Sequence, residues 1–215
     1  MKQANTDRNV VSRSSWWWLR HAPTDAAGRM IGSTNIDAQM PDHDVLKQLS
    51  RSLPSDASWL VSPLDRCKQT AEALRDFPAF ANAALEMVPD LREQDFGDWD
   101  GRAYDEPEIR NAEAFWQDPG HTAPPHGESF FDMMQRVQAA IQQNREEGNF
   151  IVVAHAGVIR AAVALALDLT PDQALRLQID PLSLTRTSWT NLPVDTDGSW
   201  LLQSLNEAPG KSYIT

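Results

Sequence analysis

Short apolar runs alternate with amphipathic stretches along most of the chain. The apolar runs predict strands at residues 16–19, 59–61, 87–91, 150–154, 182–189 and 200–205. The run at 150–154 is continuous and rich in β-branched residues, which is typical of a central parallel strand covered on both faces. The last two runs are expected to close one edge of the sheet. The pattern therefore predicts an α/β protein.

Apolar residues at helical spacing predict helices between these strands. The expected helices cover residues 42–53, about 62–77, a segment beginning after 129, 158–167 and a segment beginning after 170. Three of the helix starts carry capping signals: Ser62 followed by Pro63, Ser129 three residues before Asp132, and Thr170 followed by Pro171. The helix after Ser129 is expected to bury one apolar stripe, formed by Phe130, Met134, Val137 and Ile141.

The remaining segments are polar or rich in turn-forming residues. Residues 1–13 are mixed in charge without a period and are predicted to form a loose tail, which leaves 14–215 as a single domain. Residues 25–40 predict a loop long enough to wrap over a site. Prolines interrupt 103–125, which is expected to be a partly helical excursion over one end of the sheet.

Composition narrows the classes of partner. The 215 residues carry a net charge of −11, which argues against a general binder of nucleic acid or anionic membrane. An anionic substrate would therefore need a local basic pocket. The one cysteine, Cys67, excludes an intrachain disulfide, and no apolar run approaches the roughly 20 residues of a spanning helix. We expect a cytoplasmic protein, and the sequence leaves a homodimer open.

Four basic or imidazole side chains follow predicted strands. Arg20 and His21 come after the strand at 16–19, Arg66 lies in the first turn after the next strand, and His155 follows the strand at 150–154. The carboxyl ends of parallel strands share one edge, where open α/β folds bind ligands. Each residue also has a structural alternative, either a buried histidine with a satisfied ring or an arginine in an ion pair.

Together these side chains suit phosphoryl transfer. Two guanidiniums bind phosphate oxygens in fork geometry, and a neutral imidazole can act as the nucleophile. The acidic loop at 92–101 can supply a carboxyl group for proton transfer. Metal binding by His21 and His155 is the rival interpretation, but two arginines and the lack of a clear carboxylate or thiolate set fit it poorly.

Five ordered motifs between residues 16 and 160 carry a family resemblance. They are Leu19-Arg20-His21 with Thr24, Ser62-Pro63-Leu64-Asp65-Arg66 with Gln69-Thr70-Ala71, Glu93 with Phe96-Gly97-Asp98-Trp99-Asp100-Gly101, Gly127-Glu128-Ser129, and Val153-Ala154-His155-Ala156-Gly157-Val158-Ile159-Arg160. In this order they resemble the histidine phosphatase superfamily, in its phosphoglycerate-mutase-like branch.

The resemblance implies a three-layer α/β/α sandwich around a mostly parallel sheet, with no metal and no cofactor. It implies that His21 is the phosphorylated nucleophile and that Glu93 is the general acid and base. It places the phosphate and the substrate against Arg20, Thr24, Arg66, His155 and Ala156.

The chain departs from the family pattern at several positions without losing a proposed catalytic group. Ala22 stands where a glycine is usual, Pro23 where an acid is common, and Ala27 where many members have an asparagine. Ala156 replaces a frequent glycine, and Asp100 replaces a common glutamate. The first loop, which shapes the mouth of the site, carries most of these changes.

The resemblance also bears on the reaction. The compact length, the turn at 32–37 and the run at 124–129 look similar to α-ribazole-5′-phosphate phosphatases of cobalamin assembly, whereas mutases usually carry longer insertions. We therefore expect a phosphomonoesterase acting on a small phosphorylated metabolite. A mutase and a non-catalytic phosphate-binding module are the alternatives.

Five other conspicuous residues have simpler interpretations. His121 and His126 flank prolines and are expected at the surface, with a role in a substrate lid as the second choice. Trp99 and Trp116 are expected to anchor the excursion rather than to stack on bases, and Cys67 is expected to be a small buried side chain.

Overall fold

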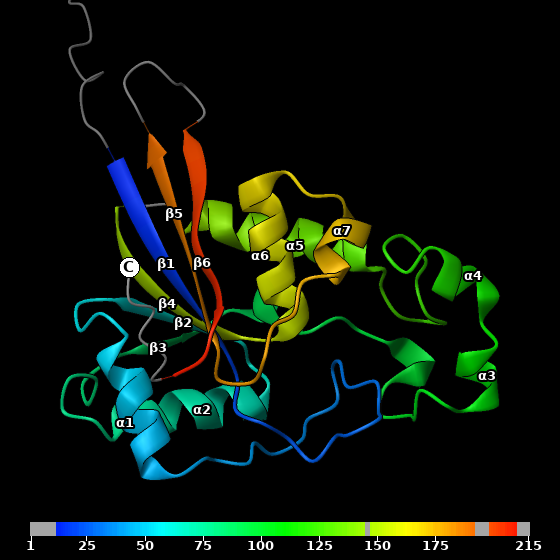
Figure 1. Cartoon of the computed structure of the whole chain (residues 1–215), viewed down its shortest axis with the longest axis horizontal. Coiled ribbons are helices and arrows are strands. Elements are labelled where there is room, and N and C mark those ends of the chain that lie inside the picture. Colours follow the sequence, from blue (N-terminus) through cyan, green and yellow to red (C-terminus); the bar gives the residue numbers. More distant parts are fainter. Residues whose placement is uncertain (1–11, 145–146, 192–197, 210–215) are drawn as a thin grey trace, which may run out of the picture.

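A six-stranded sheet forms the centre of the protein in a computed structural model that describes residues 12–144, 147–191 and 198–209 (Figure 1). The strands are β1 (Ser12–Arg20), β2 (Ser58–Val61), β3 (Leu85–Met87), β4 (Gly148–Ala154), β5 (Leu184–Asn191) and β6 (Ser199–Glu207). Their order across the sheet is β3-β2-β4-β1-β5-β6, so the two longest motif-bearing strands, β4 and β1, lie at the centre.

The sheet is parallel through its first four strands. β2 pairs in parallel with β3 and β4, and β4 pairs in parallel with β1. β5 runs antiparallel to β1, and β6 runs antiparallel to β5. The predicted mostly parallel sheet with two closing strands is therefore confirmed, and the carboxyl ends of β1, β2 and β4 share one edge.

Helices cover both faces of the sheet, which gives the expected three layers (Figure 1). The helices are α1 (His43–Arg51), α2 (Asp65–Arg75), α3 (Pro107–Arg110), α4 (Glu113–Gln117), α5 (Phe130–Gln143), α6 (Ala156–Leu167) and α7 (Pro171–Leu175). Short 3-10 turns lie at Pro89–Leu91 and Gly97–Trp99. α1 and α2 lie on one face, while α5 and α6 lie on the other.

Side chains that alternate along β1 and β4 supply both cores. Trp16 and Val152 are buried among residues of α5 and α6, and the ring of Trp16 stacks on Phe150 with centroids 4.5 Å apart. Leu19 and Val153 are buried on the opposite face among residues of α1 and α2. Because both faces of these strands are covered, their ends are held rigidly at the shared edge.

The segment between the 3-10 turn Gly97–Trp99 and α5 has a small core of its own. Met30, Trp99, Ile109 and Phe115 are buried together there, apart from the two cores on the sheet. The segment includes α3 and α4, which lie to one side of the sheet in Figure 1. The predicted excursion at 103–125 is thus partly helical.

The helix after β2 begins later than its sequence predicts. α2 begins at Asp65 with Leu64 as its N-cap, and no side chain caps it. Ser62, the predicted cap, places its Oγ 2.7 Å from Nε2 of His155 instead. Oγ of Ser62 also accepts from the amide of Leu64 at 3.4 Å, but the helix begins three residues after Ser62, so the predicted position of the cap is wrong.

Three other boundaries or faces differ from the prediction. The third strand ends at Met87, and the residues that follow form a 3-10 turn instead of extending it to 91. On α5, Met133 is fully buried while Met134 is only partly covered, although Ser129 and Asp132 form the predicted capping box. β1 begins at Ser12, and the rest of the tail predicted at 1–13 lies outside the described residues.

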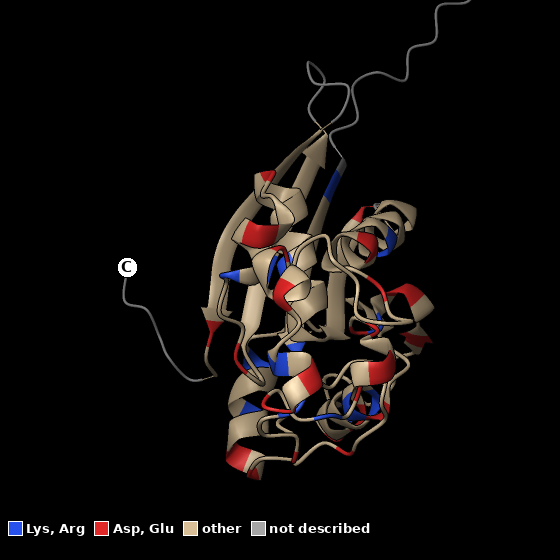
Figure 2. Ribbon diagram, turned by 90° about the vertical axis from the view of Figure 1, so that its right-hand side faces the viewer, with Lys and Arg blue, Asp and Glu red and all other residues tan. Residues whose placement is uncertain are grey.

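Charged residues lie mostly on the helices and loops and seldom on the strands (Figure 2). None of the helices in the described part of the chain has the length and apolar character that a bilayer crossing requires.

Candidate active site

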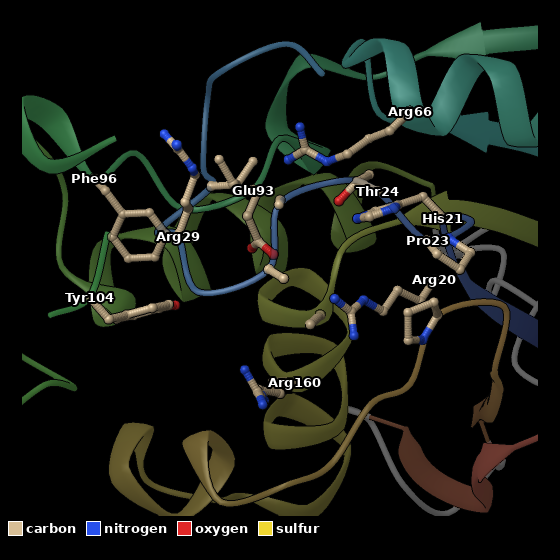
Figure 3. Close-up of a pocket in the computed structure, with 15 residues that line it drawn as sticks. Arg20, His21, Pro23, Thr24, Arg29, Arg66, Glu93, Phe96, Tyr104 and Arg160 are labelled. Atoms are coloured by element: carbon tan, nitrogen blue, oxygen red, sulfur yellow. The ribbon is translucent and has the colours of Figure 1, made fainter. Parts of the chain in front are cut away.

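A cavity of about 410 Å³ opens at the edge where β1 ends (Figure 3). The residues that line it include Arg20, His21, Thr24, Arg29, Arg66, Glu93, Phe96, Tyr104, Ala156 and Arg160. Arg20 ends β1 and His21 follows it, Arg66 lies in the first turn of α2, and Ala156 begins α6. The structure therefore brings six predicted site residues to one cavity, which is rich in arginine within an acidic protein.

His21 is held with one ring nitrogen directed at the backbone. Its Nδ1 lies 2.7 Å from the carbonyl oxygen of Ala22, and because a carbonyl only accepts, Nδ1 carries the proton. The lone pair is therefore on Nε2, the nitrogen that a nucleophile would use. The amide of Ala22 in turn donates to Oγ1 of Thr70 at 2.9 Å, which fixes this turn.

The electrostatic environment keeps the His21 ring neutral. Burial, followed by the nearby charges of Arg66 and Arg20, lowers the pKa of His21 to about 3, although the hydrogen bond to Ala22 opposes the shift. The side chain is 6% exposed. A neutral imidazole with an unprotonated Nε2 is the form that can attack an electrophile.

His155 lies behind the cavity and is completely buried. Nε of Arg66 donates to its Nδ1 at 3.2 Å, so the proton is on Nε2 and faces Oγ of Ser62 at 2.7 Å. Burial and the charge of Arg66 lower the pKa of His155 well below its usual value. Its ring packs edge-on against His21, with centroids 5.1 Å apart. His155 thus supports Arg66 and His21 and does not line the cavity wall.

Arg66 is a buried cation held by neutral acceptors. Beside the contact with His155, its two terminal nitrogens donate to the carbonyl oxygens of Gly32 and Thr34, at 2.8 and 2.9 Å. Burial lowers the pKa of Arg66, and the charge of Glu93 partly opposes this effect. The guanidinium is 1% exposed. Among the described contacts its charge has no carboxylate within ion-pair distance, so an anion in the cavity would compensate it.

Asp100 shapes the loop that holds Arg66. Its carboxylate accepts hydrogen bonds from the backbone amides of Gly32, Ser33 and Thr34, at 3.1, 2.6 and 3.2 Å. Burial raises its pKa, but these hydrogen bonds outweigh burial and leave the pKa lowered. The shorter acid at this position therefore still organises the first loop.

Arg20 is the second cation at the end of β1. One terminal nitrogen donates to the carbonyl oxygen of Ile179 at 2.6 Å, and its buried Nε lacks a partner among the described residues. Burial lowers the pKa of Arg20, while the charges of Glu93 and Asp180 oppose the shift. Arg20 and Arg66 thus approach the cavity from β1 and α2 (Figure 3).

Glu93 stands at the amino end of α6. One carboxylate oxygen accepts from the amide of Gly157 at 3.2 Å, and the other accepts from the amide of Gln94 at 3.1 Å. A Cβ atom at residue 157 would meet Oε1 of Glu93 at 2.3 Å, so only glycine permits this approach. The helix dipole further favours an acid at this position.

Arg136 on α5 fixes the backbone that carries Glu93. Its guanidinium donates to the carbonyl oxygens of Asp90, Arg92 and Glu93 at 2.7, 2.8 and 3.0 Å. It also binds both carboxylate oxygens of Glu128, at 2.5 and 3.1 Å. The Gly-Glu-Ser motif thus has a structural explanation: Glu128 orients Arg136, which holds the segment that positions Glu93.

Three polar or charged residues that line the cavity were not predicted as site residues. Arg29 and Tyr104 come from loops, and Arg160 is one turn into α6. Arg160 is the last residue of the motif that contains His155. Because it lies one helical turn after Ala156, the two side chains share a face of α6, and this spacing could have identified Arg160 as a site residue. Thr24 lines the cavity as predicted and forms an isolated antiparallel bridge with Ala38.

The other conspicuous residues mostly follow their simpler interpretations. His121 and His126 are exposed and pair with Asp118 and Asp98. Trp99 is buried, whereas Trp116 is 44% exposed. Cys67 is buried as predicted, and its burial raises the pKa of its thiol.

Metal-binding geometry lies away from the cavity. Among the described residues, Asp118, His121 and Asp172 bring metal-ligating atoms within 4.8 Å of one another at the surface. His21 and His155 instead contact a carbonyl oxygen, a hydroxyl group and a guanidinium.

Comparisons with known proteins place the chain among its relatives. A family described as the histidine phosphatase superfamily (branch 1) matches residues 16–206. Adenosylcobalamin/alpha-ribazole phosphatase of Escherichia coli is 27% identical over 76% of this chain and 84% of its own length. A bifunctional protein of Mycobacterium tuberculosis is 35% identical over a matched region that covers 60% of this chain and 36% of that protein.

The solved structures show the same fold. The alpha-ribazole phosphatase of Shigella flexneri superposes with a TM-score of 0.76 at 23% identity, covering 92% of this chain and 99% of that one. Together with the family match and the Escherichia coli relative, the fold and the cavity support phosphatase activity.

Proposed function

The chain belongs to the histidine phosphatase superfamily, and from this premise we propose that it is a phosphomonoesterase that works through a phosphohistidine on His21. One observation carries the proposal. Nδ1 of His21 is committed to the carbonyl oxygen of Ala22, which leaves the unprotonated Nε2 for an arginine-lined cavity that also contains Glu93.

In the first step, the lone pair on Nε2 of His21 attacks the phosphorus atom. The bond from phosphorus to the ester oxygen breaks, and the protonated carboxyl group of Glu93 gives its proton to the departing alkoxide. Arg20 and Arg66 stabilise the charge on the non-bridging oxygens during transfer. The products are an alcohol, a phosphohistidine and the Glu93 carboxylate.

In the second step, water enters where the alcohol left. The Glu93 carboxylate removes a proton from this water, whose oxygen attacks phosphorus and releases Nε2 of His21. The cycle ends with inorganic phosphate, a neutral imidazole and a protonated Glu93. His155 takes part as the buried support of Arg66, and the amino end of α6 contributes its dipole.

The substrate is proposed to be a small phosphorylated metabolite, with α-ribazole 5′-phosphate as the first candidate. Support comes from the similarity to the adenosylcobalamin/alpha-ribazole phosphatase of Escherichia coli and from a cavity of about 410 Å³. A cytoplasmic location, independence from metal and cofactor, and a homodimer remain predictions. The mutase remains the alternative because both reactions use a phosphohistidine, and the silent phosphate-binding module is the second alternative.

The test is phosphate release from a panel of small phosphomonoesters, with and without a metal chelator. The panel contains α-ribazole 5′-phosphate and 3-phosphoglycerate. Chelator-resistant release that is strongest for one ester is the expected result.

Absence of release from every ester would overturn the phosphatase proposal. Acid-labile phosphate on His21 would then favour the mutase, and unphosphorylated protein that still binds phosphate would favour the binding module.

A further inference from the structure

A second cavity of about 180 Å³ adjoins the first one. Glu93, Phe96, Tyr104 and Arg160 line both cavities. In Figure 3, Glu93 lies between Phe96 and Tyr104 on one side and His21 on the other. A group attached to phosphate at His21 would therefore meet Glu93 first and the second cavity beyond it.

The second cavity is walled by aromatic and aliphatic side chains. Its described lining includes Met30, Phe96, Tyr104, Phe115, Trp116, Phe130 and Leu175. Glu93 and Arg160 are the charged groups among the described residues that line it, and both also face the catalytic cavity. The wall therefore offers ring faces and methylene groups, and the charge is concentrated at the boundary.

Contacts between the rings hold this wall in place. Phe115 packs edge-on against Trp99 and against Trp116, with centroids 5.1 and 4.9 Å apart. Nε1 of Trp116 donates to the carbonyl oxygen of Ile109 at 2.7 Å, so its polar edge is satisfied within the protein. Tyr104 lies 6.5 Å from Trp116 between centroids. Tyr104 and Trp116 are 45% and 44% exposed, which leaves their surfaces available to a ligand.

We propose that this aromatic pocket binds the leaving group of the ester, and that the preferred alcohol carries one aromatic ring close to its oxygen. The proposal rests on the phosphatase function proposed above. Its geometric basis is the position of Glu93, the proton donor to the leaving oxygen, at the boundary of the two cavities. The volume is comparable to the roughly 150 Å³ of an apolar cavity that holds one benzene ring.

The competing occupant is a leaving group with a second negative charge. Arg29 and Arg160 both line the catalytic cavity and donate to the carbonyl oxygens of Gly101 and Leu177, each at 2.9 Å. Such a group would use these cations and leave the aromatic wall empty. The two occupants predict opposite orders of substrate preference.

The experiment compares 2-phenylethyl phosphate with ethyl phosphate in the full-length protein. Their alcohols have similar acidity, so the ratio of kcat/KM reports binding of the ring and not the chemistry of departure. We expect 2-phenylethyl phosphate to be favoured at least about tenfold, as is usual for an apolar group that enters a fitting pocket. 3-Phosphoglycerate, whose leaving group is anionic, should be a poorer substrate than 2-phenylethyl phosphate.

Trp116→Ala should bring the ratio of the two alkyl esters close to unity, because it removes most of one wall. Tyr104→Ala tests the same wall if Trp116→Ala does not fold, as judged by circular dichroism. Phe131→Ala is the matched control, since Phe131 is 41% exposed on α5 and lines neither cavity. The control should keep the ratio of the unaltered protein.

Two results would overturn this inference while leaving the phosphatase proposal intact. One is equal kcat/KM for both alkyl esters, and the other is a clear preference for 3-phosphoglycerate that Trp116→Ala does not change. Failure to hydrolyse any ester would instead contradict the proposed function itself.

Discussion

The two ends of the site are built in different ways. The phosphate end lies on β1, β4 and the first turns of α2 and α6, where side chains are buried and their polar atoms bind the backbone. The leaving-group end takes Tyr104, Phe115 and Trp116 from a loop and the short helix α4, a segment with a four-residue core and half-exposed rings. Its remaining wall includes residues of α5, α6 and α7. The residues proposed to act on phosphate therefore lie on the rigid centre of the fold, whereas several residues proposed to recognise the leaving group lie on a segment that can change without disturbing that centre.

This contrast separates two kinds of damage. Changes at the phosphate end should stop turnover of every ester to a similar extent. The effect of a change at Glu93, between the two ends, should depend on the leaving group, because Glu93 is proposed to protonate the departing oxygen.

The largest effect is expected for His21→Gln. Without the nucleophile no phosphohistidine forms, so turnover should fall by at least about 10³-fold for alkyl and aryl esters alike. Phosphate release and acid-labile incorporation of labelled phosphate measure the two consequences. His43→Gln, an exposed histidine of α1, is the control. Near-normal turnover by His21→Gln would exclude His21 as the nucleophile.

The next effect is expected for Glu93→Gln. An alkyl alkoxide needs a proton to leave and p-nitrophenolate does not, so alkyl esters should lose about 10²–10⁴-fold and the aryl ester much less. The ratio of kcat/KM for ethyl phosphate and p-nitrophenyl phosphate measures this selectivity. Glu113→Gln, an exposed acid of α4, should keep the normal ratio. Equal losses for the two esters would remove Glu93 from the acid role.

A smaller effect is expected for Arg136→Met, which removes the donors to the carbonyl oxygens of Asp90, Arg92 and Glu93. Misplacement of Glu93 should slow ethyl phosphate by about 10-fold to 100-fold, with the same leaving-group dependence as Glu93→Gln.

A double variant that combines Arg136→Met with Glu93→Gln tests whether Arg136 acts by positioning Glu93 or by stabilising the protein in general. Arg136→Met should add little further loss in that background, because the group it positions is already gone. Additive losses would contradict a positioning role. Arg51→Met, an exposed change in α1, serves as the control.

The smallest effect concerns pH. The pKa of His21 is about 3 in the folded protein and 6.5 in the unfolded chain, so the unfolded chain binds more protons between these values. The free energy of unfolding should therefore fall as the pH drops from 6.5 toward 3, with His21 contributing about 1 kcal/mol per pH unit. Urea denaturation of the unaltered protein and His21→Gln should show a shallower slope for the variant. Identical slopes would contradict a neutral, buried His21.

The sequence predicts the phosphate end well because the chemistry there follows directly from strand ends. The prediction that Arg20, His21 and Arg66 meet requires only the positions of the strands along the chain and the rule that the carboxyl ends of parallel strands share one edge. His155 was placed correctly in the fold, but its burial behind Arg66 depends on packing that spacing does not encode.

The leaving-group end was harder to predict for a physical reason. Arg29 and Tyr104 reach the cavity from loops, where no period fixes the direction of a side chain. Ser62 was misassigned because a hydroxyl before a proline satisfies a capping pattern, and only the fold brings His155 to within 2.7 Å of it. Trp116 packs on Phe115 and donates to the carbonyl oxygen of Ile109, as the predicted anchor would, and its exposed ring at the edge of a second cavity is the feature that the sequence does not predict.

The buried charge of Arg66 has a consequence for the proposed cycle as a whole. Its terminal nitrogens are shared between the carbonyl oxygens of Gly32 and Thr34 and whatever anion occupies the cavity. That attraction does not distinguish the phosphate of an ester from the inorganic phosphate that hydrolysis leaves behind. In the proposed cycle, inorganic phosphate is therefore expected to compete with the ester for the site, so the same contacts that capture the substrate should also slow the departure of the product.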